Sequence, residues 1–156
     1  MQSLTPELVK EFEELITHYP EKRAGLIPAL HRCQEELGGH LTPEIMEDCA
    51  EFFGLEPVEV FGVASFYPMF RFSKPGKHVV NVCHNISCAL RGAEDLISKV
   101  CEVTGAPDGG KSEDGKFSVQ RVECQGACAS APMFEIGGEY YENLDLARAE
   151  QILKGL

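Results

Sequence analysis

Two cysteine pairs, each placed directly after a predicted strand, constrain the fold of this chain most. Cys83 and Cys88, with four residues between them, follow the strand-like segment 78–82. Cys124 and Cys128, with three residues between them, follow the next predicted strand. If these two strands lie side by side and parallel, both pairs leave the sheet at the same edge and converge. The spacing therefore predicts a sheet with four thiols gathered at one edge.

Four thiolates form a soft sulfur environment, which selects zinc or an iron–sulfur cluster. Neither pair has the two-residue spacing that is usual in four-cysteine zinc ribbons. Longer loops suit a two-iron cluster, in which each pair chelates one iron. Small residues beside the cysteines would let backbone N–H groups approach the sulfurs; they are Ser87, Ala89, Gly126, Ala127, Ala129 and Ser130. The spacing favours a 2Fe-2S cluster and leaves a structural zinc site open as the alternative.

The other three cysteines are predicted to be core residues. Cys33, Cys49 and Cys101 each lie in the apolar stripe of a predicted helix, and a free cysteine behaves as a small hydrophobic residue. His84 adjoins the first cysteine pair, but a Rieske-type site needs two histidines, and no histidine lies near the second pair. We therefore expect no histidine ligand.

Composition narrows the class of protein. The formal net charge is −11, which argues against nucleic acid or an anionic membrane surface as the main partner. The first residues lack the basic and apolar segments of a signal peptide, and no apolar run approaches the ~18 residues of a membrane span. The expectation is a cytoplasmic protein without membrane insertion, in which seven cysteines point to metal binding rather than disulfides.

The first half of the chain is predicted to form four short amphipathic helices. Thr-Pro-Glu start signals occur at 5–7 and 42–44, and a further helix is expected from near Pro57 toward Phe66. Glycines at 38–39 and 54 mark helix ends. The segment 72–77 breaks the pattern and is the expected linker. These signals predict a small helical bundle over residues 1–74.

Residues 75–156 follow a different pattern, strand–helix–strand–strand–strand–helix. One helix carrying Leu90, Ala93, Ile97 and Val100 is expected between the first two strands, and residues 133–141 are expected to form a hairpin. This order predicts a thioredoxin-like α/β domain with a mixed sheet, so the whole chain is assigned to the α+β class. In such a fold the proline at position 132 is commonly cis, and we predict a cis Ala131–Pro132 bond.

The chain lacks the motifs of nucleotide and flavin sites. No G-x-G-x-x-G follows a strand, no P-loop sequence occurs, and no catalytic triad pattern is visible. We therefore predict no catalytic residue and no hydride-transfer site in this chain.

With these cysteine pairs and helical segments, the chain resembles a known family, the small 2Fe-2S subunits of the NADH-oxidising module of respiratory complex I, which are thioredoxin-like ferredoxins. Relatives of these subunits serve in NAD-linked, including electron-bifurcating, hydrogenases and formate dehydrogenases. The resemblance spans nearly the whole chain and rests on the segments 30–38, 63–70, 83–88 and 124–128, with Ala131-Pro132 after them.

The resemblance implies that Cys83, Cys88, Cys124 and Cys128 ligate a 2Fe-2S cluster and that this chain is an oxidoreductase subunit. It also implies a larger flavoprotein partner that binds NADH and FMN. The expected host is a complex-I-type NADH:quinone oxidoreductase, with a soluble hydrogenase or formate dehydrogenase as the alternative and a zinc-stabilised adaptor as a distant one. The expected location is the cytoplasm or, within a larger complex, the periphery of the inner membrane.

The helical half is expected to act as a docking module. The segment 66–72 is rich in apolar and aromatic side chains. Two roles stay open for it: a core that seats one domain on the other, or an interface with a partner.

Overall fold

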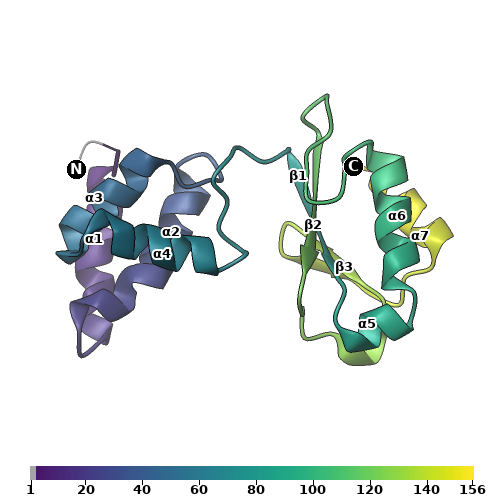
Figure 1. Ribbon diagram of the computed structural model, residues 1–156, viewed down its shortest axis with the longest axis horizontal. Helices are drawn as coiled ribbons and strands as arrows, with labels where there is room; N and C mark the ends of the chain where they lie inside the picture. Colours follow the sequence, from purple (N-terminus) through teal and green to yellow (C-terminus); the bar gives the residue numbers. More distant parts are fainter. Residues whose placement is uncertain (1–2) are drawn as a thin grey trace. The chain divides into compact units, whose positions relative to one another are not determined.

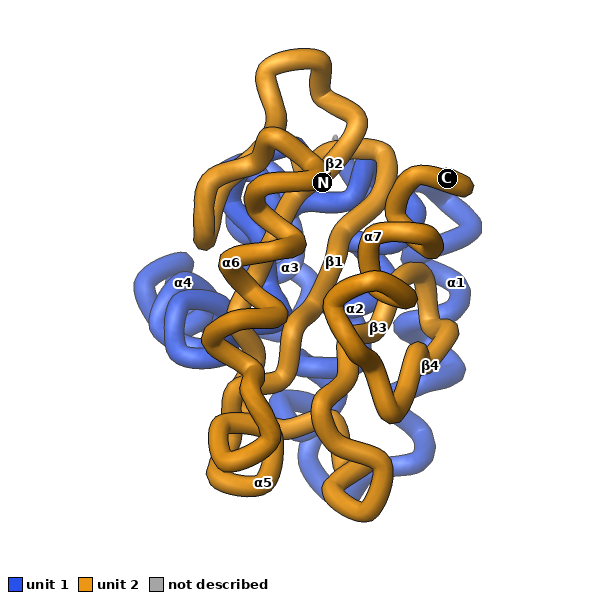
Figure 2. Tube along the Cα trace, turned by 90° about the vertical axis from the view of Figure 1, so that its right-hand side faces the viewer, with its two compact units in different colours: residues 1–74 blue, residues 75–156 orange. Residues whose placement is uncertain are grey.

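The structure is a computed structural model that describes residues 3–156 (Figure 1). The chain divides into two compact units, Met1–Lys74 and Pro75–Leu156, which are coloured separately in Figure 2. Each unit has an apolar core of its own. The first unit is helical and the second combines helices with a sheet, which confirms the predicted α+β class.

Four α-helices form the first unit, as predicted: α1 (Pro6–Leu15), α2 (Leu26–Glu36), α3 (Pro43–Phe53) and α4 (Pro57–Phe66), with the 3-10 turns η1 (Ile16–His18) and η2 (Lys22–Gly25) between α1 and α2. The amphipathic pattern predicted for all four helices is wrong for α4, which is apolar on nearly all sides. The threonine start signals act as N-caps. The Thr5 hydroxyl accepts from the Leu8 N–H at 3.2 Å, and the Thr42 hydroxyl accepts from the Ile45 N–H at 3.4 Å. These bonds satisfy N–H groups that have no partner within the helix.

The core of the first unit contains two adjacent cysteines. Cys33 on α2 and Cys49 on α3 are fully buried, and their Sγ atoms lie 3.6 Å apart. The contact with Cys33, together with burial, raises the pKa of the Cys49 thiol, so this thiol stays protonated and unreactive. Cys101 is half-buried at the margin of the second core. Cys33 and Cys49 are therefore core residues, as predicted. Cys101 is less buried than its place in the apolar stripe of a helix led us to expect.

Gln34 fixes the segment that follows α4. Its side-chain NH2 donates to the Met69 carbonyl at 3.0 Å, and its side-chain oxygen accepts from the Arg71 N–H at 2.7 Å. Between these two bonds Phe70 turns into the core and is buried. Met69 and Phe72, on either side of this segment, are exposed.

The second unit contains a four-stranded mixed sheet with the order β2-β1-β3-β4. The strands are β1 (His78–Cys83), β2 (Phe117–Val122), β3 (Phe134–Ile136) and β4 (Glu139–Tyr141). β1 and β2 are parallel, whereas the other neighbours are antiparallel. Helices α6 (Ala93–Thr104) and α7 (Leu146–Lys154) pack together on the same face of the sheet (Figure 1). The predicted mixed sheet, the hairpin and the cis Ala131–Pro132 bond are confirmed.

The prediction of a single helix between β1 and β2 was wrong. The structure has a short helix α5 (Ile86–Leu90), then Arg91 and Gly92, and then α6. Gly92 has φ 90°, a left-handed conformation that interrupts the helix and that glycine adopts at little cost. Leu90 consequently points to solvent with 83% of its surface exposed instead of joining the core stripe.

Gly76, just before β1, packs closely against the backbone of β2. A Cβ added at this position would lie 2.5 Å from the Phe117 carbonyl carbon and 2.8 Å from the Ser118 nitrogen. Because both atoms belong to the backbone of β2, they cannot yield as a flexible side chain would. We expect Gly76→Ala to destabilise the second unit by roughly 1–3 kcal/mol, measured by urea unfolding and by amide exchange in β1 and β2.

Gly62→Ala is the matched control, because Gly62 lies inside α4 and an added Cβ would meet nothing within 4 Å. This change should stabilise α4 by about 0.5–1 kcal/mol. If Gly76→Ala had the same free energy of unfolding as the unmodified protein, the close packing of Gly76 on β2 would be contradicted.

Candidate metal centre

The parallel pairing of β1 and β2 places both cysteine pairs at one edge of the sheet. Cys83 is the last residue of β1 and lies in register with Val122, the last residue of β2. The His84 N–H donates to the Val122 carbonyl at 3.1 Å and extends the ladder by one bond. Cys124 follows two residues after Val122. The two loops that carry the cysteines therefore begin side by side, as the sequence predicted.

Cys83 and Cys88 meet in the interior of this edge. Both are almost fully buried, with 3% and 2% of their surfaces exposed, and they pack with Ala93, Ala131 and Met133. Burial raises the pKa of the Cys88 thiol to about 11, and its hydrogen bond with Cys83 contributes to the increase. Asn85 positions α5 for this contact, because its side chain caps the helix by accepting from the Ile86 N–H at 2.7 Å.

Cys124 and Cys128 lie on the outer side, in the exposed segment 123–130. Cys128 begins the 3-10 turn η3 (Cys128–Ser130) and is close enough to contribute electrostatically to the raised pKa of Cys88. Cys124 Sγ accepts from the Gly126 N–H at 3.3 Å, which Gly126 permits with its left-handed φ of 76°. A backbone N–H thus reaches a cysteine sulfur, as the small residues of this loop led us to expect.

The four cysteines do not surround a single point. Within residues 3–156, no three His, Cys, Asp or Glu side chains lie close enough together to hold a metal ion. The structure brings Cys83 and Cys88 into contact, puts Cys128 near them and leaves Cys124 bonded within its own loop. In a 2Fe-2S cluster each cysteine pair would bind its own iron, so three ligands around one ion are not required.

The donor set nevertheless fits an iron–sulfur cluster. Four thiols with backbone N–H groups beside them match the ligands and hydrogen bonds of such clusters. Binding would have to displace the protons from the thiols, including the Cys88 proton that burial retains. His84 is directed elsewhere, since its Nε2 lies 3.7 Å from a Glu123 carboxylate oxygen. This placement gives no support to a histidine ligand.

Contacts from the end of the sheet hold the outer loop, and sequence reasoning missed them. The Tyr140 hydroxyl on β4 donates to the Gln125 side-chain oxygen at 3.3 Å. The Asn143 N–H donates to the Ser130 carbonyl at 2.7 Å. The only signal in the sequence is an aromatic residue at an outward position of the hairpin. This signal does not reveal the partner.

Comparison with known proteins gives consistent results. The sequence pattern of the thioredoxin-like 2Fe-2S ferredoxin family matches residues 12–156. The chain is 43% identical over 147 residues to NADH-quinone oxidoreductase subunit 2 of Thermus thermophilus, covering 92% of this chain and 81% of that protein. It is 37% identical over 145 residues to an NADH-quinone oxidoreductase subunit of Rhizobium meliloti, covering 93% and 86%.

A solved structure is also similar to this chain. The chain superposes on an NAD+-reducing NiFe hydrogenase in its air-oxidised state with a TM-score of 0.70 and 25% identity. The match covers 83% of this chain and 22% of the hydrogenase chain. Because the family pattern extends from Phe12 to the last residue and the paired cysteines meet at one edge of its sheet, this chain belongs to the thioredoxin-like 2Fe-2S ferredoxin family.

Proposed function

We propose that this chain is the one-electron carrier subunit of a complex-I-type NADH:quinone oxidoreductase, with a 2Fe-2S cluster on Cys83, Cys88, Cys124 and Cys128. The observation that carries the proposal is the parallel pairing of β1 and β2, which brings both cysteine pairs to one sheet edge. The names of the relatives support the host, since they are subunits of NADH-quinone oxidoreductases. A zinc-stabilised adaptor has no comparable support.

The cluster would supply one-electron chemistry, which suits a partner flavin that receives a hydride and releases electrons singly. The residues of this chain would provide an asymmetric environment for it. Cys83 and Cys88 lie on the buried side, where Met133 and Ala131 exclude water. Cys124 and Cys128 lie on the exposed side, which would be the side open to an electron partner.

The surface of α5, the helix that carries Cys88, is suited to contact with a protein. Ile86 and Leu90 on α5 flank Cys88 in the sequence and are 75% and 83% exposed. Large apolar side chains in such positions are typical of interfaces. We infer that the larger NADH- and FMN-binding flavoprotein subunit covers this edge.

The first unit would serve as a docking module through an exposed apolar surface. We call this surface the α4 patch; it consists of Val58, Phe61, Phe66, Met69 and Phe72. The rings of Phe61 and Phe72 lie 5.7 Å apart, so the patch is continuous there. Phe70 is buried in the core of the first unit itself, whereas Phe66, 77% exposed, fits the interface role that was left open for the segment 66–72.

One alternative to a complex-I-type host has specific support. The structural similarity to an NAD+-reducing hydrogenase favours the same electron-carrier role in a soluble NAD-linked hydrogenase. In the part of the chain that the structure describes, no helix is long and apolar enough to cross a membrane. We propose a cytoplasmic location, at the inner membrane periphery when the host complex is membrane-bound.

The ligand assignment predicts a clear division among the cysteines. Replacing Cys83, Cys88, Cys124 or Cys128 singly by Ala should abolish or cripple cluster assembly, because one iron would lose a ligand. The unmodified protein should contain about two irons and two acid-labile sulfides per chain and give an S = 1/2 EPR signal after reduction. Iron, sulfide and EPR measurements on anaerobically purified variants test this.

The matched controls are Cys33→Ala, Cys49→Ala and Cys101→Ala. These should retain iron, sulfide and the EPR signal and lose roughly 1–2 kcal/mol of stability at the buried positions. Retention of the full cluster in Cys124→Ala together with its loss in Cys49→Ala would overturn the ligand assignment.

The α4 patch predicts a loss of assembly without a loss of the cluster. We expect the double change Phe61→Ser and Phe66→Ser to weaken binding to the flavoprotein subunit by roughly tenfold or more, since two large apolar contacts are removed. Co-purification of the coexpressed subunits and an affinity titration measure the effect. Leu146→Ser is the control, because Leu146 is an exposed apolar residue on α7. Equal losses from both variants would rule out the α4 patch.

A further inference from the structure

A groove in the first unit lies outside both the cysteine site and the α4 patch. It has a volume of about 460 Å³ and runs between α1 and α2. Its apolar lining consists of Phe12 and Leu15 from α1 and Ile27 and Pro28 from α2. Phe12 is fully buried and forms the floor, whereas the other three are half-buried and remain accessible. The volume falls within the range of about 300–1,000 Å³ that is typical of binding pockets.

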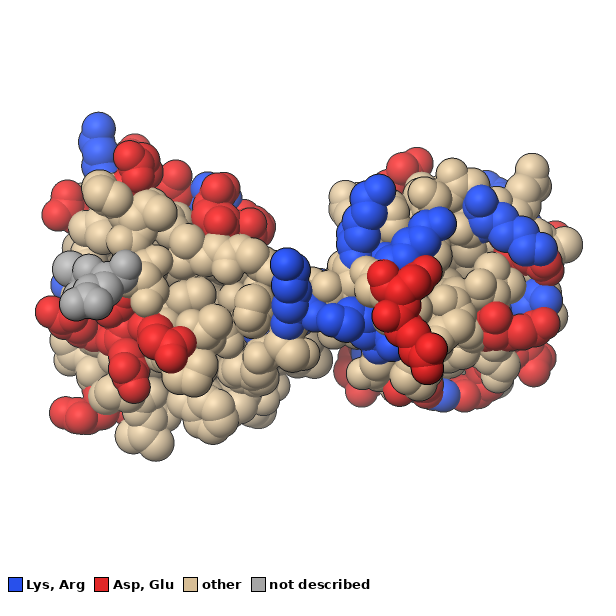
Figure 3. All heavy atoms as spheres, turned by 90° about the horizontal axis from the view of Figure 1, so that it is seen from above, with Lys and Arg blue, Asp and Glu red and all other residues tan. Residues whose placement is uncertain are grey.

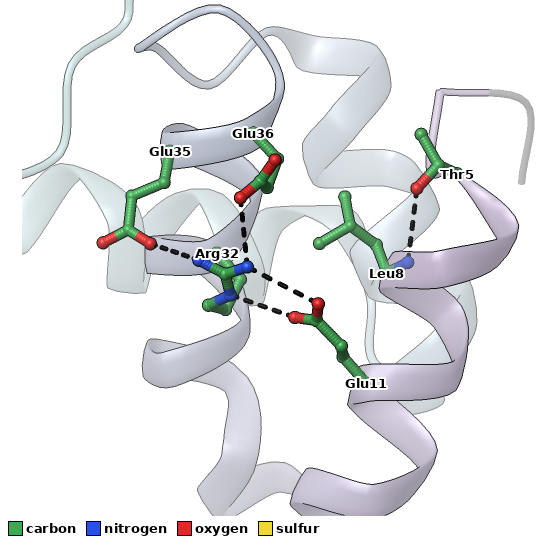
Figure 4. A network of polar contacts seen from close by, with 6 residues as sticks. All are labelled: Thr5, Leu8, Glu11, Arg32, Glu35 and Glu36. Atoms are coloured by element: carbon green, nitrogen blue, oxygen red, sulfur yellow. Dashed lines mark hydrogen bonds and ion pairs between the residues drawn. The ribbon is translucent and has the colours of Figure 1, made fainter.

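An ion network with excess negative charge borders this groove. Arg32, which lines the groove with Glu11, donates to three carboxylates (Figure 4). The distances are 3.0 Å to Glu11, 2.5 Å to Glu35 and 3.1 Å to Glu36. One guanidinium balances one of the three negative charges. Glu35 and Glu36 each use a single oxygen on Arg32 and are more than half exposed, so their second oxygens are available to a cation.

The chain as a whole has the same sign of charge. The whole chain has a net charge of −11, and acidic side chains predominate at the edges of the first unit in Figure 3. A fatty acid carboxylate would be repelled here, and a second copy of this chain would bring like charges together. A partner that fits this groove therefore has apolar side chains for the groove itself and positively charged side chains for its acidic border.

We propose that the α1–α2 groove binds a cationic amphipathic segment of a partner protein. Apolar side chains on one face of this segment occupy the groove over Phe12, and its Lys or Arg side chains pair with Glu35 and Glu36. This is the helix-in-groove form of peptide recognition, with the charges setting the orientation of the segment. The inference stands independently of the proposed electron-carrier role, because it uses none of the cysteines and no residue of the α4 patch.

The test uses the full chain with its cluster and a defined probe. The probe is a short synthetic peptide with leucines at i, i+3, i+4 and i+7 and lysines at the other positions. One control peptide has glutamates in place of the lysines, and another has serines in place of the leucines. We expect the lysine–leucine peptide alone to bind by calorimetry and to shift the NMR amide signals of α1 and α2.

Two sets of variants separate the groove from general attraction to an acidic protein. The double change Glu35→Gln and Glu36→Gln should weaken binding roughly three- to tenfold. The double change Glu47→Gln and Glu113→Gln removes the same charge from exposed positions elsewhere and should leave the affinity unchanged. Ile27→Ala removes part of the apolar lining and should weaken binding by a similar factor, with folding checked by circular dichroism.

Several results would overturn the proposal. They are absence of binding, equal affinity for all three peptides, or amide shifts confined to the α4 patch. Two other occupants would give results of their own, each of which also contradicts the proposal. Dodecanoate that shifts the α1 and α2 amides when the peptide does not would assign the groove to an acyl chain. Shifts that depend on protein concentration alone would assign it to a second copy of this chain.

Discussion

The parallel pairing of β1 with β2 is the constraint on which the second unit depends. Parallel neighbours cannot be joined by a tight turn, so the chain must cross over the sheet between them, and α5 and α6 make this crossover. The same pairing gives both strands carboxyl ends at one edge. Two cysteine pairs far apart in the sequence therefore begin in register at Cys83 and Val122. A slip of register would move one pair away from the other.

The cysteine site owes its asymmetry to the elements that carry it. Cys83 ends a strand in the middle of the sheet, and Cys88 lies on a helix packed against that edge, so both thiols are buried. Cys124 and Cys128 lie on a loop held by a few peripheral contacts, among them the bond from Tyr140 to Gln125. A cluster bound here would be shielded on one side and close to the surface on the other, which is the arrangement that electron exchange with a partner requires.

The first unit uses only part of its apolar surface for its own core. α4 is apolar on nearly all sides, yet only its Val60 and Ala64 are buried, and Val58, Phe61 and Phe66 are exposed. The groove between α1 and α2 is a second surface of this kind, with a charged border in place of an aromatic one. These two exposed apolar surfaces are the basis of the docking roles proposed for this unit.

The sequence by itself determined the element types and the candidate cysteines, because their signals are local. Thr5 and Thr42 cap helices within three residues of themselves, and each cysteine pair adjoins its strand. The tertiary structure decided what local patterns cannot encode. The apolar stripe runs on through positions 90–100, but the left-handed Gly92 divides this stretch into two helices. Phe70 is buried in the core and Phe66 is exposed, because Gln34 holds the backbone on both sides of Phe70. Burial of one cysteine pair and exposure of the other likewise depend on packing between segments distant in the sequence.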